Sequence, residues 1–288
     1  MLRLGLTSAI VLTAALLMAP ADGRSDGLPD WREVTSPGAG TAPQVFGGHA
    51  RGCLDGAVPL PLGGVGYQVM RPQRNRFWGH PALIDYIERL AAALAVQGWP
   101  GLLIGDLSQP RGGPMPGGHR SHQTGLDVDI WFASAPPVPL TDEERERLAA
   151  VSVVAAGGDE VGAAWTEELA TVLRTAAGFA EVDRIFVNAT IKRELCRTTG
   201  DDREWLSRLR PWWGHDDHFH VGLRCPMDDA ACLDRQPPVP AGDGCGSELD
   251  WWFSAEARGE TGAKPSPPPK RPTLEDLPPA CRIVLMQP

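Results

Sequence analysis

Two short segments that alternate apolar and polar residues constrain the fold of this chain most strongly. In residues 126–130 two aspartates alternate with apolar residues, and in residues 218–223 two histidines alternate with apolar residues. Successive side chains of a β-strand point to opposite faces of the sheet. The two aspartates therefore share one face of the first strand, and the two histidines share one face of the second. We expect the strands to pair in one sheet, so that carboxylates and imidazoles line the same side.

Histidines are concentrated around these two segments. Five of the seven in the chain lie within residues 117–131 and 212–223, namely His119, His122, His215, His218 and His220. One Asp and two His around a point form the open three-ligand arrangement of catalytic zinc. Zinc lowers the pKa of a bound water from about 15.7 to about 7, which provides hydroxide at neutral pH. The clustering indicates a metalloenzyme, although His119, His215 and Asp127, taken singly, could equally be supporting or loop residues.

The first 21 residues have the pattern of a targeting segment. Arg3 precedes an apolar stretch over residues 4–18, and Ala19, Pro20 and Ala21 form an A-x-A cleavage site. The apolar stretch is shorter than the roughly 20 residues that a transmembrane helix needs. We predict a cleaved secretory signal, with an uncleaved anchor as the alternative, and no membrane span after cleavage.

The cysteines fit export to an oxidising compartment. The chain has an even set of six, and none of them forms a C-x-x-C pair, so a zinc finger or redox motif is not indicated. We expect three disulfides. Spacing alone favours only a short loop between Cys225 and Cys232 and leaves the other pairs open.

Composition limits the kinds of function. With 288 residues and 42% apolar content, the chain can build a sizeable core. The formal net charge of −9 argues against nucleic-acid binding. Ten Trp against two Tyr is an unusual ratio. These tryptophans are expected to line the core and a cleft, and tryptophan faces can also stack on sugar rings.

The order of apolar and breaker residues favours an α+β fold, with a central, mostly antiparallel sheet and flanking helices. We expect an exposed leader over residues 22–50, a single domain over 51–285 and a Pro-rich extension from about 235. Thr141 to Glu144 has the pattern of a capping box. Strands are predicted at 67–70, 101–107, 126–132 and 182–187, and helices at 81–97, 141–153, 165–177, 190–196 and 203–209.

At these residues the sequence resembles the penicillin-insensitive murein endopeptidases. They belong to a wider group that includes lysostaphin-type enzymes, D-Ala-D-Ala metallopeptidases and the hedgehog signalling domain. The group's motif is His-x6-Asp followed by His-x-His, matched here by His122 with Asp129 and His218 with His220. The likeness extends over roughly residues 50–285 and is also visible in residues 118–130, 184–188, 210–212 and 242–246.

The resemblance implies a role for each site residue and a hedgehog/DD-peptidase-like fold. His122, Asp129 and His220 would bind zinc, and His119 could also reach the metal. His218 would be a general base or stabilise the transition state, and His215 would be a further catalytic histidine. The implied disulfides are Cys53–Cys281, Cys196–Cys245 and Cys225–Cys232.

One departure from the family concerns a second metal. Some members build a second metal position from an Asp and a His between the two histidine windows. Residues 155–162 of this chain contain Asp159 and Glu160 but no His. We therefore expect one zinc site.

The implied function is a zinc endopeptidase that hydrolyses D-alanyl–meso-diaminopimelyl cross-links of peptidoglycan in the periplasm and is insensitive to penicillin. A serine nucleophile is disfavoured, because neither Gly-x-Ser-x-Gly nor Ser-x-x-Lys occurs. Two alternatives stay open. One is a D-Ala-D-Ala carboxypeptidase or dipeptidase with the same metal site, and the other is a non-catalytic module that binds the cell wall.

Overall fold

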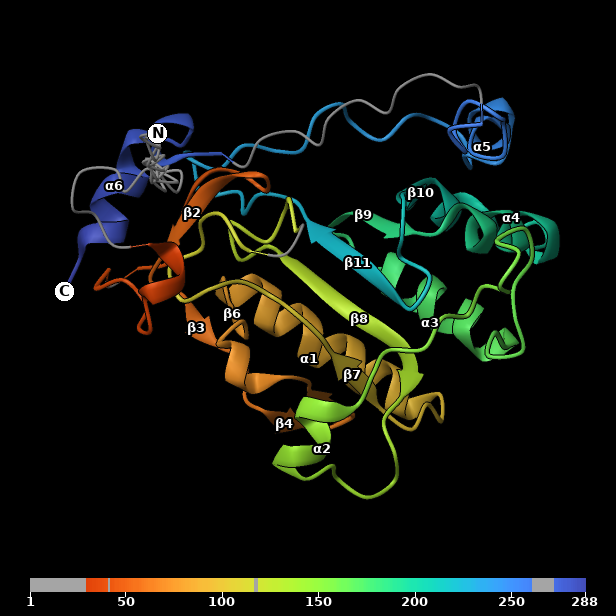
Figure 1. Ribbon diagram of the computed structural model, residues 1–288, viewed down its shortest axis with the longest axis horizontal. Coiled ribbons are helices and arrows are strands. Elements are labelled where there is room, and N and C mark those ends of the chain that lie inside the picture. Colours follow the sequence, from red (N-terminus) through yellow and green to blue (C-terminus); the bar gives the residue numbers. More distant parts are fainter. Residues whose placement is uncertain (1–29, 41, 117–118, 261–271) are drawn as a thin grey trace, which may run out of the picture.

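The computed structural model describes residues 30–40, 42–116, 119–260 and 272–288. In this part of the chain, seven strands form a central mixed sheet in the order β10-β9-β11-β8-β7-β5-β4 (Figure 1). The pairs β10–β9 and β5–β7 are parallel and the other neighbours are antiparallel, which confirms the predicted α+β fold with a mostly antiparallel sheet. The strands are β4 (Gly63–Gly64), β5 (Tyr67–Val69), β7 (Leu102–Ile104), β8 (Asp127–Ser134), β9 (Val182–Val187), β10 (Leu209–Pro211) and β11 (His218–Leu223).

The two alternating segments pair as predicted. Strands β8 and β11 are antiparallel neighbours, and His220 lies directly opposite Asp129. Val128 and Ile130 of β8 and Phe219 and Val221 of β11 are fully buried in the main core. Because side chains alternate, a slip of one residue would carry these apolar groups to the other face, so core packing fixes the register that brings His220 to Asp129.

Two helices cover the apolar face of the sheet. They are α1 (Pro81–Val96) and α3 (Glu167–Ala177), and their buried residues join the same core as β8 and β11. The buried Tyr86 of α1 donates a hydrogen bond from its hydroxyl to the carbonyl of Ala176 in α3 (3.3 Å). At the start of α1, Nδ1 of His80 accepts a hydrogen bond from the backbone N–H of Ala82 (3.2 Å), which caps the helix. The opposite face carries the polar residues described below and a smaller buried apolar cluster that includes Met70, Leu103 and Trp131.

The helix predicted over 141–153 is too long. The capping box at Thr141 forms, but α2 (Asp142–Arg147) ends before Leu148, whose backbone is extended. The following segment is hydrogen-bonded to distant parts of the chain instead, for example from Val153 N to the carbonyl of Asp216 (2.7 Å). Tertiary hydrogen bonds therefore override the local helical signal. The helix predicted over 203–209 is a 3-10 turn, η3 (Glu204–Arg208), and α4 (Ala189–Thr198) is slightly longer than predicted.

The exposed leader predicted over 22–50 is wrong for its last part. Residues Gln44–Gly48 form β1, which pairs with β2 (Arg51–Asp55), and Gly47 also exchanges backbone hydrogen bonds with Ala231 and Leu233. Trp31, in the turn η1 (Trp31–Glu33), is buried as well. The Gly- and Pro-rich composition concealed a segment that is ordered by distant partners. The predicted signal over residues 1–21 lies outside the described residues.

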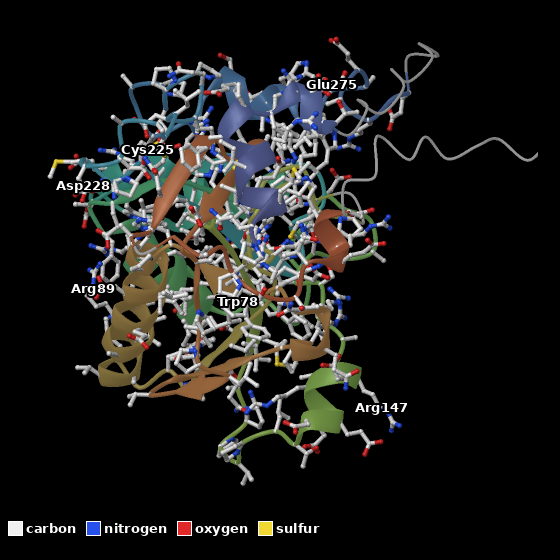
Figure 2. The ribbon with its side chains drawn as sticks, turned by 90° about the vertical axis from the view of Figure 1, so that its left-hand side faces the viewer. Trp78, Arg89, Arg147, Cys225, Asp228 and Glu275 are labelled. Carbon is white, nitrogen blue, oxygen red and sulfur yellow. A yellow bond between two sulfur atoms is a disulfide. The ribbon has the colours of Figure 1, made fainter. Side chains whose placement is uncertain are left out.

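The three disulfides join Cys53 to Cys281, Cys196 to Cys245 and Cys225 to Cys232, the pairs that the family resemblance implies. The first attaches helix α6 (Pro279–Met286) to β2. In Figure 2, α6 (blue) lies against the orange strands of β1 and β2, and α2 (yellow-green) lies at the opposite end of the molecule.

The buried guanidinium of Arg111 binds the C-terminal end of α6. It donates hydrogen bonds to the carbonyls of Val284, Leu285, Gln287 and Pro288 at 2.6–3.2 Å. A cation at the C-terminus of a helix also opposes the negative end of the helix dipole.

Two short sheets complete the fold, β1–β2 and the pair of β3 (Val58–Pro59) with β6 (Trp78–Gly79). Each helix in the described ranges is too short or too polar to cross a lipid bilayer.

Candidate metal centre

Three histidines from the two windows meet at the carboxylate of Asp129. Its Oδ1 is 2.8 Å from Nδ1 of His220 and 3.3 Å from Nε2 of His122. Its other oxygen is 3.7 Å from Nδ1 of His119. Asp129 comes from β8, His220 from β11, and the other two histidines from the loop before β8. The structure therefore brings together all four residues that the sequence suggested as metal ligands.

The donor set fits a metal ion. Ligand atoms of His119, His122 and Asp129 all lie within 4.8 Å of one another, and His220 adjoins them through Asp129. His122 is buried, and its Nδ1 has no hydrogen-bond partner among the described residues. Imidazole nitrogens with one carboxylate oxygen are donors that zinc accepts. This side of the sheet thus has the chemistry of a cation site.

The loop before β8 is held in a strained conformation that turns His122 back over the sheet. His122 has φ +69°, in the left-handed region that residues other than glycine rarely adopt. Its backbone N–H donates to Asp127 (3.3 Å). Gly125 (φ +66°) allows close packing here, because a Cβ at this position would lie 2.4 Å from the Leu54 side chain. Strain of this kind costs about 1–3 kcal/mol and is typical of functional sites.

A second carboxylate, Asp127, lies behind His220. It is fully buried, and its oxygens are 2.9 Å from Nε2 of His220, 2.6 Å from Nη2 of Arg235 and 2.7 Å from Nδ1 of His49. Burial alone would raise the pKa of Asp127, but His49 and Arg235 hold it well below its usual range. An ionised carboxylate only accepts hydrogen bonds, so Nε2 of His220 carries the hydrogen. Nδ1 is then the atom that faces Asp129 and the other histidines.

His218 lies beside this cluster. Its Nδ1 is 2.6 Å from Oδ1 of Asp217, and its Nε2 is 3.8 Å from Oδ1 of Asp129. Burial alone would lower the pKa of His218, but the carboxylates of Asp129 and Asp217 raise it above its ordinary value. Because Asp217 accepts the Nδ1 hydrogen, Nε2 is directed to the same side as the candidate metal ligands.

His215 completes the group and also has a strained backbone (φ +52°). Its Nδ1 donates to the carbonyl of Trp213 (2.9 Å), and its ring lies 4.9 Å from that of His218 and 6.0 Å from that of His220. Burial and the nearby His220 and His218 lower the pKa of His215 to about 4. The five histidines of the two windows thus form one continuous group.

Comparison with known proteins shows the family of this chain. Residues 45–286 match the family described as penicillin-insensitive murein endopeptidase. The chain belongs to this family. Relatives with that name include proteins of Yersinia enterocolitica, Klebsiella pneumoniae and Citrobacter koseri. They are 44%, 43% and 42% identical to this chain over 88%, 94% and 98% of its length and over 90%, 96% and 96% of theirs.

In this murein endopeptidase family member, a cleft of about 350 Å³ opens beside the candidate metal centre. His119, Asp129 and His218 line it, together with Asp106 and Trp131. Asp106 was missed as a site residue, because it lies within the strand predicted over 101–107, whereas β7 ends at Ile104. Its Oδ2 is 2.8 Å from Nη1 of Arg76 and 3.4 Å from Nε2 of His119, so it holds the His119 ring from the side away from Asp129.

The other missed residues are partners of carboxylates. His49 lies in the segment predicted to be an exposed leader, and Arg235 lies near the start of the Pro-rich extension. Neither position carries a local motif, so the sequence gives no signal for them. Asp217 could have been found, because it directly precedes His218.

Proposed function

We propose that this chain is a zinc-dependent endopeptidase that hydrolyses D-alanyl–meso-diaminopimelyl cross-links in peptidoglycan. The observation that carries the proposal is the convergence of His119, His122 and His220 on Asp129, with His218 next to them at the edge of the cleft. Membership of the penicillin-insensitive murein endopeptidase family supports the substrate class.

His122, Asp129 and His220 are the proposed zinc ligands, and His119 is placed to reach the same ion. Zinc bound there would polarise an amide carbonyl and lower the pKa of water. We propose a single zinc site. Asp159, the acidic residue considered for a second one, forms an ion pair with Arg258.

The proton transfers are assigned to His218. The hydrogen on Nδ1 is engaged by Asp217, so Nε2 is available to take a proton from the attacking water and to pass it to the leaving amine. His215 is held by the Trp213 carbonyl and lies against the His218 ring. Because the ring is neutral and its one hydrogen is held by Trp213, Nε2 of His215 is an acceptor, and we assign it to accept a hydrogen bond from the attacking water or the substrate amide beside His218.

A serine mechanism is disfavoured by the position of Asp127. Ser121 Oγ is 3.4 Å from Nε2 of His220, which superficially resembles a Ser-His-Asp arrangement. In such a triad the aspartate binds one ring nitrogen and the serine the other. Here Asp129 does bind the opposite nitrogen, Nδ1, but Asp127 also binds the Nε2 that faces Ser121 and keeps a hydrogen on it, so this nitrogen cannot act as the base. Direct attack by water forms no acyl-enzyme, and β-lactams trap acyl-forming serines, which accounts for insensitivity to penicillin.

We also propose that the protein acts in the periplasm. Three disulfides favour an oxidising compartment, and the N-terminal sequence has the pattern of a cleaved signal. A cell-wall substrate requires export as well.

The test is an incubation of the purified mature protein with cross-linked dimeric muropeptides. Conversion of dimers to monomers, blocked by a chelator and not by penicillin, is the expected result. Release of terminal D-Ala while dimers persist would instead indicate a carboxypeptidase with the same site. If dimers persist unchanged with added zinc, a non-catalytic binding module becomes the better interpretation.

A further inference from the structure

Four tryptophans gather beside the metal centre. Trp212 and Trp213 directly follow β10, and Trp251 and Trp252 lie at the end of helix α5 (Ser247–Trp251). The ring of Trp213 lies 5.3 Å from that of Trp212, 6.2 Å from that of Trp251 and 4.5 Å from that of Trp252. We refer to these residues as the tryptophan cluster.

The cluster is exposed in a way that core tryptophans are not. The exposed fractions are 56% for Trp213, 40% for Trp251 and 38% for Trp212, against 7% for Trp31 and 6% for Trp131. Burial of a tryptophan contributes a large hydrophobic free energy, part of which these exposed rings forgo. Exposed apolar side chains that are grouped rather than scattered mark interaction surfaces.

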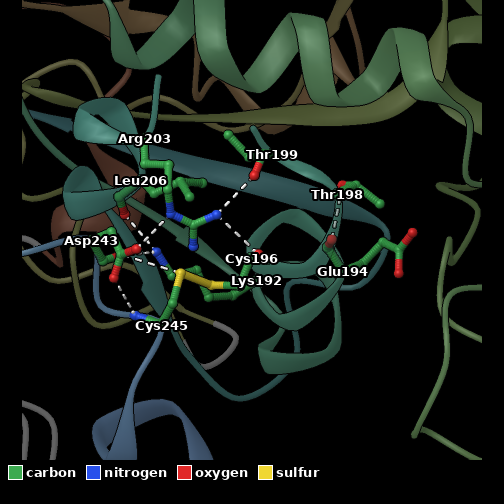
Figure 3. Close-up of a disulfide and its surroundings, with 9 residues drawn as sticks. All are labelled: Lys192, Glu194, Cys196, Thr198, Thr199, Arg203, Leu206, Asp243 and Cys245. Atoms are coloured by element: carbon green, nitrogen blue, oxygen red, sulfur yellow. Dashed lines mark hydrogen bonds and ion pairs between the residues drawn. A yellow bond between two sulfur atoms is a disulfide. The ribbon is translucent and has the colours of Figure 1, made fainter. Parts of the chain in front are cut away.

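Helix α5 is fixed in place by covalent and ionic contacts. Just before it, Cys245 forms the disulfide with Cys196 of α4, and Asp243 accepts hydrogen bonds from Arg203 (2.8 Å) and Lys192 (2.5 Å) (Figure 3). Within it, Glu248 forms an ion pair with Arg210 of β10. A five-residue helix would not be stable alone. These contacts hold Trp251 and Trp252 next to Trp212 and Trp213, so the cluster is part of the folded structure.

The cluster is continuous with the catalytic histidines. The Trp212 ring packs on Phe186 at 5.3 Å, and Phe186 packs on His220 at 5.7 Å and on His215 at 6.1 Å. The backbone carbonyl of Trp213 accepts the hydrogen bond from His215. A molecule bound at the metal centre and extending past Phe186 therefore lies over the cluster.

Polar groups around the cluster indicate what it binds. A cavity of about 490 Å³ lined by Trp212, Trp213 and Trp252 also contains Asn188, Arg258 and Glu260. Asn188 is hydrogen-bonded to Gly214 and Thr190, and Arg258 is paired with Asp159, so the walls beside the indoles are polar. An acyl chain or a fully apolar peptide would desolvate these groups without offering them a new hydrogen bond, which is unfavourable. A pyranose ring suits this combination of indole rings and polar side chains. Its C–H face stacks on an indole, while its hydroxyl and acetamido groups bind polar side chains at the edge of the cavity.

We propose that the tryptophan cluster binds the glycan strand of peptidoglycan, with N-acetylhexosamine rings stacked on the indoles, while the cross-linking peptide lies at the metal centre. The inference rests on the proposed function, because it takes peptidoglycan as the substrate. A peptide chain extends by at most about 3.3–3.6 Å per residue. The ring separations from His220 to Phe186 and from Phe186 to Trp212 are 5.7 and 5.3 Å, so a stem of a few residues is long enough to reach Trp212 from the centre.

The first experiment measures binding of soluble glycan strands whose stem peptides have been removed, by titration calorimetry on the full mature protein. Replacing Trp251 and Trp252 together by Ala should weaken binding at least tenfold, and replacing both by Phe should restore part of it. Ile283→Ala on α6, a similarly exposed apolar residue, is the matched control and should bind like the wild type. Absence of glycan binding by the wild type, or equal binding by the double Ala variant with an unchanged circular dichroism spectrum, would overturn the proposal.

The second experiment compares cleavage of cross-linked peptide dimers with and without their disaccharides. The wild type should have a several-fold lower KM for the glycan-bearing dimer, and this difference should disappear in the double Ala variant. Equal kcat/KM of the wild type on both substrates would overturn the glycan site and leave the endopeptidase function intact. Glycan binding that depends on the tryptophans, without cleavage of either dimer, would support the site and reject the endopeptidase function.

Discussion

Asp127 and His220 contact each other between neighbouring strands, with Oδ1 of the carboxylate 2.9 Å from Nε2 of the ring. The other ring nitrogen lies 2.8 Å from Asp129. The imidazole is therefore held by one carboxylate on each side, and the two carboxylates have different surroundings. Asp127 is fully enclosed by donors, whereas Asp129 borders the cleft. Asp127 can orient the ring without itself reaching the metal position.

The substitution Asp127→Asn should weaken zinc binding by about 10–100-fold, as loss of such supporting carboxylates does elsewhere. The amide keeps the shape but removes the negative charge that fixes the hydrogen on Nε2 and balances Arg235. Competition with a chromophoric chelator measures the affinity. Asp85→Asn, at an exposed ion pair on α1, is the control. Wild-type zinc affinity in the Asp127 variant would refute the orienting role.

His218→Ala should reduce turnover by about 100- to 10,000-fold and retain zinc, because His218 is assigned to proton transfer. His220→Ala should lose zinc and activity together, since its Nδ1 faces the other ligand atoms. Metal content by atomic emission and kcat on dimeric muropeptides separate the two outcomes. Loss of zinc in the His218 variant would make it a ligand rather than a proton carrier.

Arg111→Ala should lower the free energy of unfolding by about 3 kcal/mol. The change leaves several buried carbonyls of α6 without their charged donor. The midpoint of urea unfolding measures the loss. Arg282→Ala, an exposed position on the same helix, should change stability by less than about 0.5 kcal/mol. Similar midpoints for the two variants would contradict the stabilising role of the hydrogen bonds from Arg111 to α6.

Stability should fall below neutral pH partly through His80. Burial lowers the pKa of His80 from its ordinary 6.5, against the opposing charges of Asp229 and Asp228. The unfolded chain therefore binds the proton at a higher pH than the folded chain does. The contribution of His80 is complete above pH 6.5 and declines as the pH falls below it.

The variant His80→Asn tests this contribution, because Asn also caps a helix but does not titrate in this range. Urea unfolding at pH 7.5, 6.5 and 5.5 should show a larger loss of stability on acidification for the wild type than for the variant. Parallel curves for the two proteins would show that His80 does not titrate on unfolding.

The parts of the fold that follow a local pattern could be predicted from the sequence. Alternation at Asp129 and His220 is a property of neighbouring residues, and it correctly placed both side chains on one face of paired strands. The predicted helix over 141–153 failed after Arg147, because its continuation makes tertiary hydrogen bonds that no local pattern encodes. The contact of His49 with Asp127 joins positions far apart in the chain, and only the folded backbone brings them together.

The bond between Cys53 and Cys281 also limits when the fold can be completed during synthesis. The two cysteines are separated by 228 positions, so β2 is synthesised long before its covalent partner exists. Until residue 281 has been made, Cys53 has no disulfide partner, and Arg111 has no α6 carbonyls to bind. The smaller core cluster, in which Trp31 and Cys53 pack against Leu277, Val284 and Leu285, is therefore complete only once α6 has been made.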